Sequence, residues 1–297
     1  MFQISLYAPN PDTASLYELT LETCGALSVT LSDAADQPLL EPGPGETPIW
    51  QQVVVTGLFD DNANAEQISS DIFNMLGSDA AEPQLKTETI ADRDWVRAWM
   101  DDFKPMRFGT RLWICPSVYQ PPEPDAVNIM LDPGLAFGTG THPTTALCLR
   151  WLDAHPPANK QVIDYGCGSG VLAIAALLLK ADQVTAVDND PQALQASHDN
   201  AQRNQVTDRL LVCSPTEVGK ESKHKVDLLI ANILAGPLQE LAPVLARLLK
   251  PGASLVLSGV LLEQAESVKQ AYANTVDWLT MTEEQGWICL EGRRKVN

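Results

Sequence analysis

The first 90 residues alternate between short runs of hydrophobic positions typical of strands and longer stretches with helical spacing. The predicted strands are FQISLYA (2–8), ALSVTLS (26–32), QQVVVTGLF (51–59) and QLKTETI (84–90), and the predicted helices span residues 13–24 and 65–76. This β-α-β-β-α-β order is that of a ferredoxin-like split βαβ unit. We therefore predict a small α+β domain over residues 1–90.

From about Arg107 the pattern changes, because short β-branched strands now alternate with helices of 10 to 15 residues. The predicted strands are RLWICPS (111–117), AVNIMLD (126–132), QVIDYG (161–166), QVTAVDND (183–190), RLLVCS (209–214), VDLLIAN (226–232) and ASLVLSG (253–259), and the predicted helices are 143–154, 169–181, 191–205 and one that ends at 249. Such alternation predicts parallel strands in a doubly wound α/β sheet over residues 107–297.

Between these two patterns lies an amphipathic segment, DRDWVRAWMDDF, in which Trp95 and Trp99 stand four residues apart. Two tryptophans on one helical face most often pack against a domain rather than bind a ligand. We therefore predict a connecting helix within residues 91–106.

Charge separates the two patterns further. The net charge is -18, and residues 1–85 hold 13 Asp and Glu without a single Lys, Arg or His. Such an acidic surface either only keeps the domain soluble or docks a basic partner, and both interpretations stay open. It disfavours direct binding of duplex DNA by this third of the chain.

Composition narrows the class of protein. The chain contains no run of 18 uncharged apolar residues and no basic leader followed by an apolar core, so we expect a cytoplasmic protein without a membrane segment. Its 6 cysteines form no CxxC pair and its 4 histidines show no metal-ligand spacing. We therefore expect neither a disulfide framework nor a metal site.

A glycine loop, DYGCGSG, follows the predicted strand 161–166. Gly166 and Gly168 match the first two glycines of the NAD-binding pattern GxGxxG, but no glycine stands at the third position. The loop also carries no GK[ST], so it does not fit the P-loop pattern of nucleoside triphosphatases either. Asp164 at the strand end would repel a pyrophosphate and favour a cationic ligand. S-adenosyl-L-methionine, which carries an ammonium and a sulfonium, is such a ligand.

Two further strand ends carry polar residues. Asp188 stands at the end of the next predicted strand, 22 residues after Gly166. At this position its carboxylate can accept hydrogen bonds from both ribose hydroxyls of a nucleoside. Asp190, by contrast, is placed to cap the following helix. Asn232 ends VDLLIAN at the same edge of the sheet. Its amide either positions an amine or the cofactor, or simply makes a turn or helix cap.

These motifs carry a resemblance. DYGCGSG with VDND resembles the first motif and the ribose acid of class I S-adenosylmethionine-dependent methyltransferases, and PGLAFGTGTHPTT followed by IANILA is similar to the ribosomal protein L11 methyltransferase family over nearly the whole chain. The resemblance implies a Rossmann-like class I sheet, and an N-terminal domain that recognises the substrate. It also implies that the cofactor is contacted by Thr145, Gly166, Gly168, Asp188 and Asn232.

The implied reaction is methylation of lysine side chains and of the N-terminal α-amine of the basic ribosomal protein L11. Methyl transfer needs alignment of the reactants more than a nucleophile on the enzyme. We therefore assign no catalytic residue, and interpret Asn232 only as a residue that positions the amine. We also expect the protein to be a monomer.

Two alternatives remain. One is methylation of a glutamine or adenine nitrogen, which is disfavoured because Asn232-Ile-Leu-Ala lacks the [ND]PP[YF] pattern expected of such enzymes. The other is an acidic adaptor that binds no cofactor.

The segment GLAFGTGTHPTT, residues 134–145, contains no Lys or Arg, so it does not read as a second phosphate loop. We interpret it as a mobile cover, in which Phe137 excludes water and Thr145 reaches the cofactor from the side opposite Asp188. His142 is interpreted as a structural hydrogen-bonding residue rather than a base.

Overall fold

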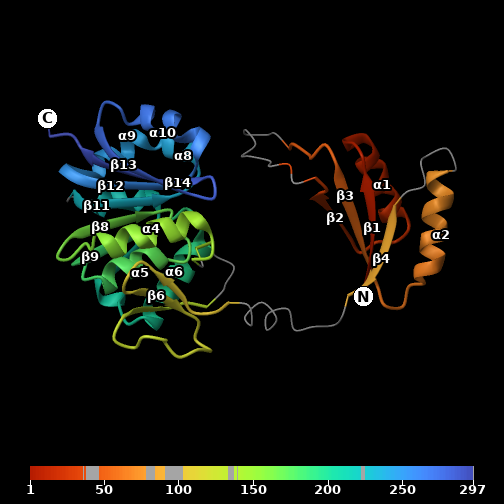
Figure 1. Ribbon diagram of the computed structural model, residues 1–297, viewed down its shortest axis with the longest axis horizontal. Coiled ribbons are helices and arrows are strands. Elements are labelled where there is room, and N and C mark those ends of the chain that lie inside the picture. The colour runs from red at the N-terminus through yellow and green to blue at the C-terminus, as the bar shows by residue number, and fades with distance from the viewer. Residues whose placement is uncertain are drawn as a thin grey trace. The chain divides into compact units, whose positions relative to one another are not determined.

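The computed structural model describes residues 1–35, 37, 47–77, 84–90, 103–132, 137–138, 140–221 and 225–296. The chain divides into two compact units, Met1–Asp94 and Trp95–Asn297 (Figure 1). Residues 91–102, which include most of the predicted connecting helix with Trp95 and Trp99, lie outside the described residues, so that helix stays a prediction.

The N-terminal unit is a four-stranded antiparallel sheet with two helices. Its elements are β1 (Phe2–Ala8), α1 (Pro11–Thr23), β2 (Ser28–Asp33), β3 (Val53–Phe59), α2 (Ala65–Leu76) and β4 (Leu85–Thr89). The strand order β2-β3-β1-β4 is that of the split βαβ unit predicted above. Helix α1 begins earlier than residue 13, because the Asn10 side chain accepts from Thr13 N at 2.8 Å and Pro11 suits the first turn.

Alternation along the strands builds the core of this unit. In β1, Phe2, Ile4, Leu6 and Ala8 are buried, and the residues between them are partly exposed. The buried side chains pack with Leu21 of α1 and with other apolar residues of the unit. One face of the sheet is therefore held against the helices by burial of apolar area.

The C-terminal unit contains a seven-stranded sheet in the order β10-β9-β8-β11-β12-β14-β13. Its strands are β8 (Gln161–Tyr165), β9 (Gln183–Val187), β10 (Leu210–Cys213), β11 (Val226–Asn232), β12 (Leu249–Leu261), β13 (Val276–Glu284) and β14 (Trp287–Arg294). The pairs among β8 to β12 are parallel, as predicted. The strand order reverses between β8 and β11, and ligands bind at such a switch point in open α/β sheets.

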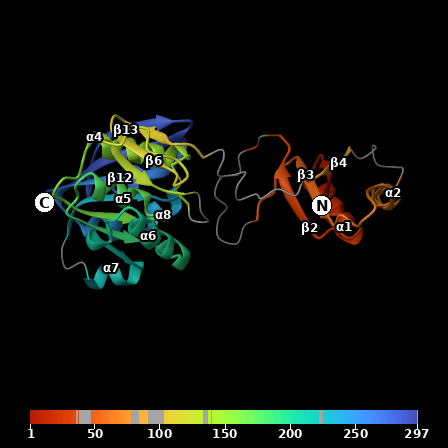
Figure 2. The ribbon, with the colours of Figure 1, turned by 90° about the horizontal axis from the view of Figure 1, so that it is seen from below.

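Helices cover both faces of this sheet (Figure 2). They are α4 (Pro143–Ala154), α5 (Val171–Leu178), α6 (Pro191–Arg203), α7 (Pro215–Glu221), α8 (Ala235–Glu240), α9 (Ala242–Leu248) and α10 (Ala265–Ala271), with short 3-10 turns at Thr207–Arg209 and Leu262–Gln264. Val162 of β8 packs in the core with residues of α4 and α5, whereas its neighbour Ile163 packs in the core with α8 and α9. Because successive strand residues face opposite sides, both faces are buried.

The sequence pattern missed the antiparallel end of the sheet. Strand β14 lies between β12 and β13 and runs antiparallel to both. Gln285 and Gly286 form the two-residue turn of this hairpin. Their φ angles are 54° and 81°, and positive φ at both positions is typical of the tight turns that connect antiparallel strands. The predicted parallel pairing is confirmed for β8 to β12, and the sheet also carries one antiparallel hairpin at its edge.

One buried acid on α4 connects that helix to a smaller three-stranded sheet. The strands of this sheet are β5 (Met106–Phe108), β6 (Leu112–Cys115) and β7 (Val127–Met130). Asp153 is 3% exposed and accepts from Thr110 N at 2.7 Å and Arg111 Nε at 3.2 Å. Burial raises the pKa of Asp153, but the hydrogen bonds from Thr110 and Arg111 outweigh it and hold the pKa below its ordinary value.

Replacement of Asp153 by alanine is expected to lower the free energy of unfolding by about 2 to 4 kcal/mol at neutral pH, because Thr110 N loses its acceptor. Because the pKa of Asp153 is lower in the folded than in the unfolded protein, its carboxylate stabilises the fold fully at pH values above the unfolded-state pKa. This contribution is lost as the pH falls through the folded-state pKa. Urea denaturation should therefore show that the difference in free energy of unfolding between the parent protein and Asp153→Ala becomes smaller at acid pH. Asp182→Ala, at an exposed acid, is the control and should change little.

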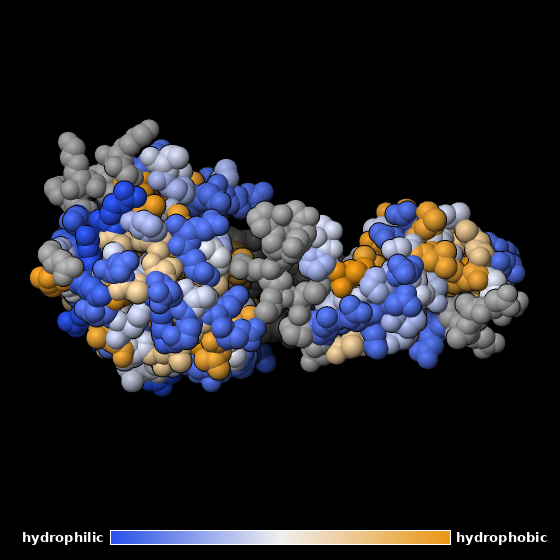
Figure 3. All heavy atoms as spheres, turned by 90° about the horizontal axis from the view of Figure 1, so that it is seen from above, coloured by the Kyte–Doolittle hydropathy of each residue, from blue (hydrophilic) through white to orange (hydrophobic). Residues whose placement is uncertain are grey.

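On the face shown in Figure 3, hydrophilic side chains cover most of the C-terminal unit, whereas apolar side chains take up a large share of the N-terminal unit. Among the described residues, no helix has the length and apolar character needed to cross a membrane.

Candidate active site

Two of the predicted site residues, Gly166 and Asp188, line a cavity at the carboxyl end of the parallel strands, whereas Thr145, Gly168 and Asn232 are not part of its lining. The cavity has a volume of about 450 Å³ and is lined by Tyr165, Gly166, Asp188, Asn189, Pro215, Ile233, Leu234, Pro237 and Leu241. Gly166 follows β8, Asp188 follows β9 and Ile233 follows β11, so three strand ends contribute to one wall. This is the position that the strand-order reversal predicts for a ligand.

The glycine loop is shaped by close approach of the neighbouring chain. Gly166 and Gly168 have φ angles of 79° and 53°, in the region that favours glycine. A Cβ at Gly166 would lie 2.1 Å from Ile233 Cγ2, and one at Gly168 would lie 2.5 Å from the Phe137 carbonyl oxygen. Larger side chains at these two positions would therefore displace either the cavity wall or the segment around Phe137.

The two glycine-rich loops of the sequence contact one another. Ser169 N donates to the Phe137 carbonyl at 2.8 Å, and Ser169 Oγ donates to the Gly138 carbonyl at 2.7 Å. Residues 137 and 138 therefore lie against the DYGCGSG loop. The Phe137 side chain is 58% exposed.

Asp188 is fixed at the edge of the cavity by two backbone donors. Its Oδ2 accepts from Gly168 N at 2.9 Å, and its Oδ1 accepts from Asp190 N at 3.0 Å. Asp190 in turn caps α6, as predicted, by accepting from Gln192 N at 2.9 Å. The two acids thus differ in role, because only Asp188 lines the cavity.

Asn232 and Thr145 meet although they are 87 residues apart in the chain. Asn232 Nδ2 donates to Thr145 Oγ1 at 3.3 Å, and Thr145 is fully buried on α4. Asn232 Oδ1 is buried and has no hydrogen-bond partner among the described residues. Because an unpaired buried acceptor is costly, it indicates a donor that a bound molecule would supply.

The structure places Asp164 differently from the expectation that its carboxylate lies beside the ligand. Asp164 is 1% exposed and is absent from the cavity wall, and its Oδ2 accepts from Ala173 N of α5 at 3.0 Å. Burial, together with the nearby Asp188 carboxylate and against the hydrogen bond from Ala173 N, raises the pKa of Asp164 to about 7. Its Oδ1 has no partner among the described residues.

An aromatic group that the sequence did not predict stands near the start of α4. The His142 ring lies 5.6 Å from the Phe137 ring and 4.9 Å from the Trp287 ring, both edge to face. His142 also caps α4 by accepting from Thr144 N, and burial lowers its pKa, which favours the neutral ring. Trp287 belongs to the unpredicted hairpin, so no local pattern links it to His142.

The residues present fit a cationic nucleoside cofactor. Asp188 offers carboxylate oxygens to hydroxyls, the apolar Ile233 and Leu234 line the same cavity, and Asn232 keeps an unpaired buried oxygen. No group of three or more potential metal ligands occurs among the described residues.

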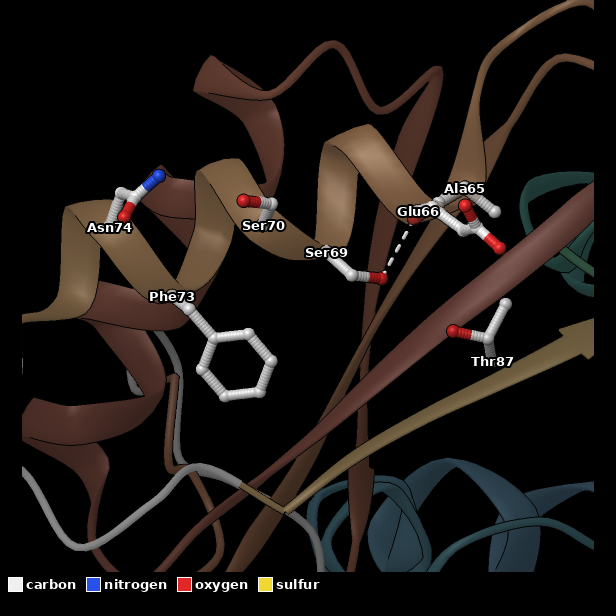
Figure 4. A pocket seen from close by; sticks show the side chains of 7 residues that line it. All are labelled: Ala65, Glu66, Ser69, Ser70, Phe73, Asn74 and Thr87. Carbon is white, nitrogen blue, oxygen red and sulfur yellow. Dashed lines mark hydrogen bonds between the residues drawn. The ribbon is translucent and has the colours of Figure 1, made fainter.

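A separate hollow of about 540 Å³ lies on the N-terminal unit, between α2 and β4 (Figure 4). It is lined by Ala65, Glu66, Ser69, Ser70, Phe73, Asn74 and Thr87. The Phe73 side chain points from α2 into this space and is 44% exposed. Glu66 is the one charged residue of the lining among the described residues, so the hollow is acidic.

Comparison with known proteins identifies the family. A sequence model of the family described as ribosomal protein L11 methyltransferase matches residues 2–295. The proteins of that name from Marinobacter nauticus and Pseudomonas aeruginosa are 54% and 51% identical, each over 98% of this chain and over 98% and 97% of their own lengths. A crystal structure titled ribosomal protein L11 methylase, from Lactobacillus delbrueckii subsp. bulgaricus, has 34% identity and a TM-score of 0.59, and covers 65% of this chain and 100% of that chain. The chain therefore belongs to the ribosomal protein L11 methyltransferase family, whose methyl donor is S-adenosyl-L-methionine.

Proposed function

We propose that this protein methylates amines of ribosomal protein L11, both lysine side chains and the N-terminal α-amine. The observation that carries the proposal is the unpaired buried oxygen of Asn232 beside Thr145, at the carboxyl end of β11. An amide oxygen accepts a hydrogen bond from an amine N–H and leaves the nitrogen lone pair free. Family membership supplies the substrate, because the relatives are named for it.

The proposed cofactor contacts come from four places in the chain. S-adenosyl-L-methionine supplies an activated methyl group on its sulfonium. We assign ribose binding to Asp188, and close backbone approach to Gly166 and Gly168. Thr145 and Asn232 contact the cofactor from the side of α4 and β11, and their mutual hydrogen bond keeps the amide in one orientation.

The protein must receive an amine that is neutral. A lysine ammonium, with a pKa of about 10.4, costs about 4 to 5 kcal/mol to deprotonate at pH 7, whereas an α-amine with a pKa of about 7.7 to 8 costs about 1 kcal/mol. Desolvation lowers the first cost, since burial disfavours the charged amine. We propose that the partly buried rings of His142 and Trp287 provide these dry surroundings, and that the neutral His142 ring does not repel the incoming ammonium.

We also propose that the N-terminal unit recognises the substrate, with the domain limits 1–90, 91–106 and 107–297 predicted from the sequence. Its 13 acids without a basic residue over residues 1–85 support attraction of a basic protein. The hollow between α2 and β4 is lined by an exposed Phe73 and by Glu66. We place the enzyme in the cytoplasm as a monomer that does not bind duplex DNA.

A substrate with a planar amide is less well supported. Enzymes that methylate glutamine or adenine nitrogens are expected to place an aromatic ring after the Asn, and here Ile233 and Leu234 follow it and line the cavity. Two flexible aliphatic side chains offer no flat stacking surface.

Labelling tests the substrate. Undermethylated ribosomal proteins incubated with the enzyme and methyl-labelled S-adenosyl-L-methionine are expected to yield label in L11, at lysines and at the N-terminal amine, and the KM for L11 is expected to rise with ionic strength. Label in DNA or in a glutamine side chain would contradict the proposal. Calorimetric binding of L11 without binding of the cofactor would instead indicate an adaptor.

A further inference from the structure

The sheet of the N-terminal unit ends at β4, and the outer edge of this strand is open. Strand β4 pairs with β1 alone, in an unbroken antiparallel register. Directly after the strand, Ile90 N donates to the Met1 carbonyl at 2.9 Å. Because inward and outward backbone groups alternate along an antiparallel strand, the N–H and C=O groups of Leu85, Thr87 and Thr89 turn away from β1. Within the described ranges these groups make no hydrogen bond.

This open edge borders the hollow between α2 and β4, which we call the α2–β4 hollow (Figure 4). Thr87 lines it from the strand, and the residue opposite Thr87 on β1 is the buried Ile4, so Thr87 lies on the face that the helices cover. The α2 residues of the lining recur at helical spacing on one stripe. A chain added to the edge of β4 would therefore place every second side chain on the side of this stripe.

Phe73 gives the α2–β4 hollow an apolar anchor. Its side chain points from α2 into the hollow and is 44% exposed, whereas that of its neighbour Ile72 is fully buried in the core of the unit (Figure 4). An aromatic ring that loses water on binding is among the largest contributions that one side chain makes at a protein interface. The ring is therefore available to pack against an apolar side chain of a bound segment.

Charge decides which kind of segment fits. Glu66 lines the hollow two helical turns from Phe73, and no salt bridge joins it within the part of the chain that the structure describes. Lys86, the first cation of the chain, points to the opposite face of the sheet and pairs with Glu88 at 2.7 Å. An acidic hollow on a unit without other cations before position 86 attracts a basic chain and repels an acidic one.

From the open edge, the exposed ring and the charge we infer that an extended basic segment of the protein substrate binds as a fifth strand on β4, along the α2–β4 hollow. Its backbone pairs with Leu85, Thr87 and Thr89, an apolar side chain packs on Phe73, and a lysine or arginine pairs with Glu66. In such strand addition the backbone bonds supply affinity and the side-chain contacts supply specificity. This inference rests on the proposed function, and it gives the N-terminal unit a defined mode of recognition.

Thr87→Pro tests the strand addition, because proline removes an N–H that points away from β1 and so leaves the pairing of β4 with β1 intact. The KM for undermethylated L11 is expected to rise about three- to tenfold, with kcat and the calorimetric Kd for S-adenosyl-L-methionine unchanged. Thr87→Val is the matched control, since it keeps the backbone N–H and should leave the KM unchanged.

The double variant Phe73→Ala, Glu66→Gln tests the hollow without altering the strand, so it decides the matter if the proline variant fails to fold. The KM for L11 is expected to rise about tenfold. Its control is Met75→Ala, Glu22→Gln, which also removes one exposed apolar side chain and one exposed acid from the helices of this unit, but outside the lining. The control should keep the KM of the parent.

Amide hydrogen exchange, followed by NMR on the full chain, reports the backbone pairing directly. In the free protein the amides of Leu85, Thr87 and Thr89 are expected to exchange faster than those of Lys86 and Glu88, which turn toward β1. Addition of undermethylated L11 is expected to slow the first three by about tenfold or more. Contact through side chains alone would leave this alternation unchanged.

The outcomes separate the two proposals. If the parent enzyme does not methylate L11, the proposed function fails. If it does, but the proline variant keeps the KM of Thr87→Val and the outward amides exchange as before, the strand addition is wrong. Slow exchange of these amides without L11, together with a larger sedimentation coefficient, would overturn the inference by assigning the edge to a second copy of the chain.

Discussion

Replacing Asp188 by alanine is expected to weaken the binding of S-adenosyl-L-methionine by about 100- to 10,000-fold. We propose that Asp188 makes two charge-assisted hydrogen bonds to the ribose, each contributing about 1.5 to 3 kcal/mol, and the variant would lose both. It also removes the acceptor of Gly168 N, so the glycine loop loses one of its supports. Isothermal titration calorimetry of the cofactor measures the effect directly, without the protein substrate.

Asp190→Ala is the matched control for this experiment. Asp190 is an acid two residues further along the same loop, but its side chain caps α6 and does not line the cavity. Loss of the cap is expected to cost about 1 kcal/mol of stability and to leave cofactor affinity nearly unchanged. If Asp188→Ala binds the cofactor as tightly as Asp190→Ala does, the assignment of the ribose contact is wrong.

Asn232→Ala is expected to lower kcat for methylation of L11 by about 100-fold, because the variant removes the acceptor that we propose aligns the amine. The truncation also removes the donor to Thr145 Oγ1. Steady-state kinetics with saturating cofactor, together with the calorimetric Kd for S-adenosyl-L-methionine, separate amine positioning from cofactor binding. The expected signature is a large fall in kcat with a much smaller rise in that Kd.

Thr145→Val serves as the companion variant, since it keeps the shape of a fully buried side chain and removes only the hydroxyl. It should lower kcat less than Asn232→Ala does, because the amide remains but is no longer held by its partner on α4. A rise in the cofactor Kd with unchanged kcat in both variants would assign this pair to the cofactor alone.

Much of the site could be predicted from local patterns. The ends of β8, β9 and β11 were recognisable because each is a short hydrophobic run followed by a polar or glycine residue, and parallel strands bring such ends to one edge. The division of roles between Asp188 and Asp190 also followed from position, since a residue just before Pro191 suits a helix cap.

The antiparallel hairpin was missed for a physical reason. In β13, Leu279 and Met281 are exposed, so its alternation does not mark a buried face. Insertion of β14 between β12 and β13 is a long-range pairing that no local period encodes. The contact of Trp287 with His142 depends on that insertion.

The sequence by itself determined the strand and helix order of the N-terminal unit, the parallel strands of the C-terminal unit with the residues that end them, and the acidity of the N-terminal third, because periodicity, charge and turn residues are local properties. Only the tertiary structure decided that Asn232 meets Thr145, that Trp287 reaches His142 and that Asp164 lies buried under its loop. These outcomes follow from strand insertion and close packing between distant segments, and packing is a property of the whole fold.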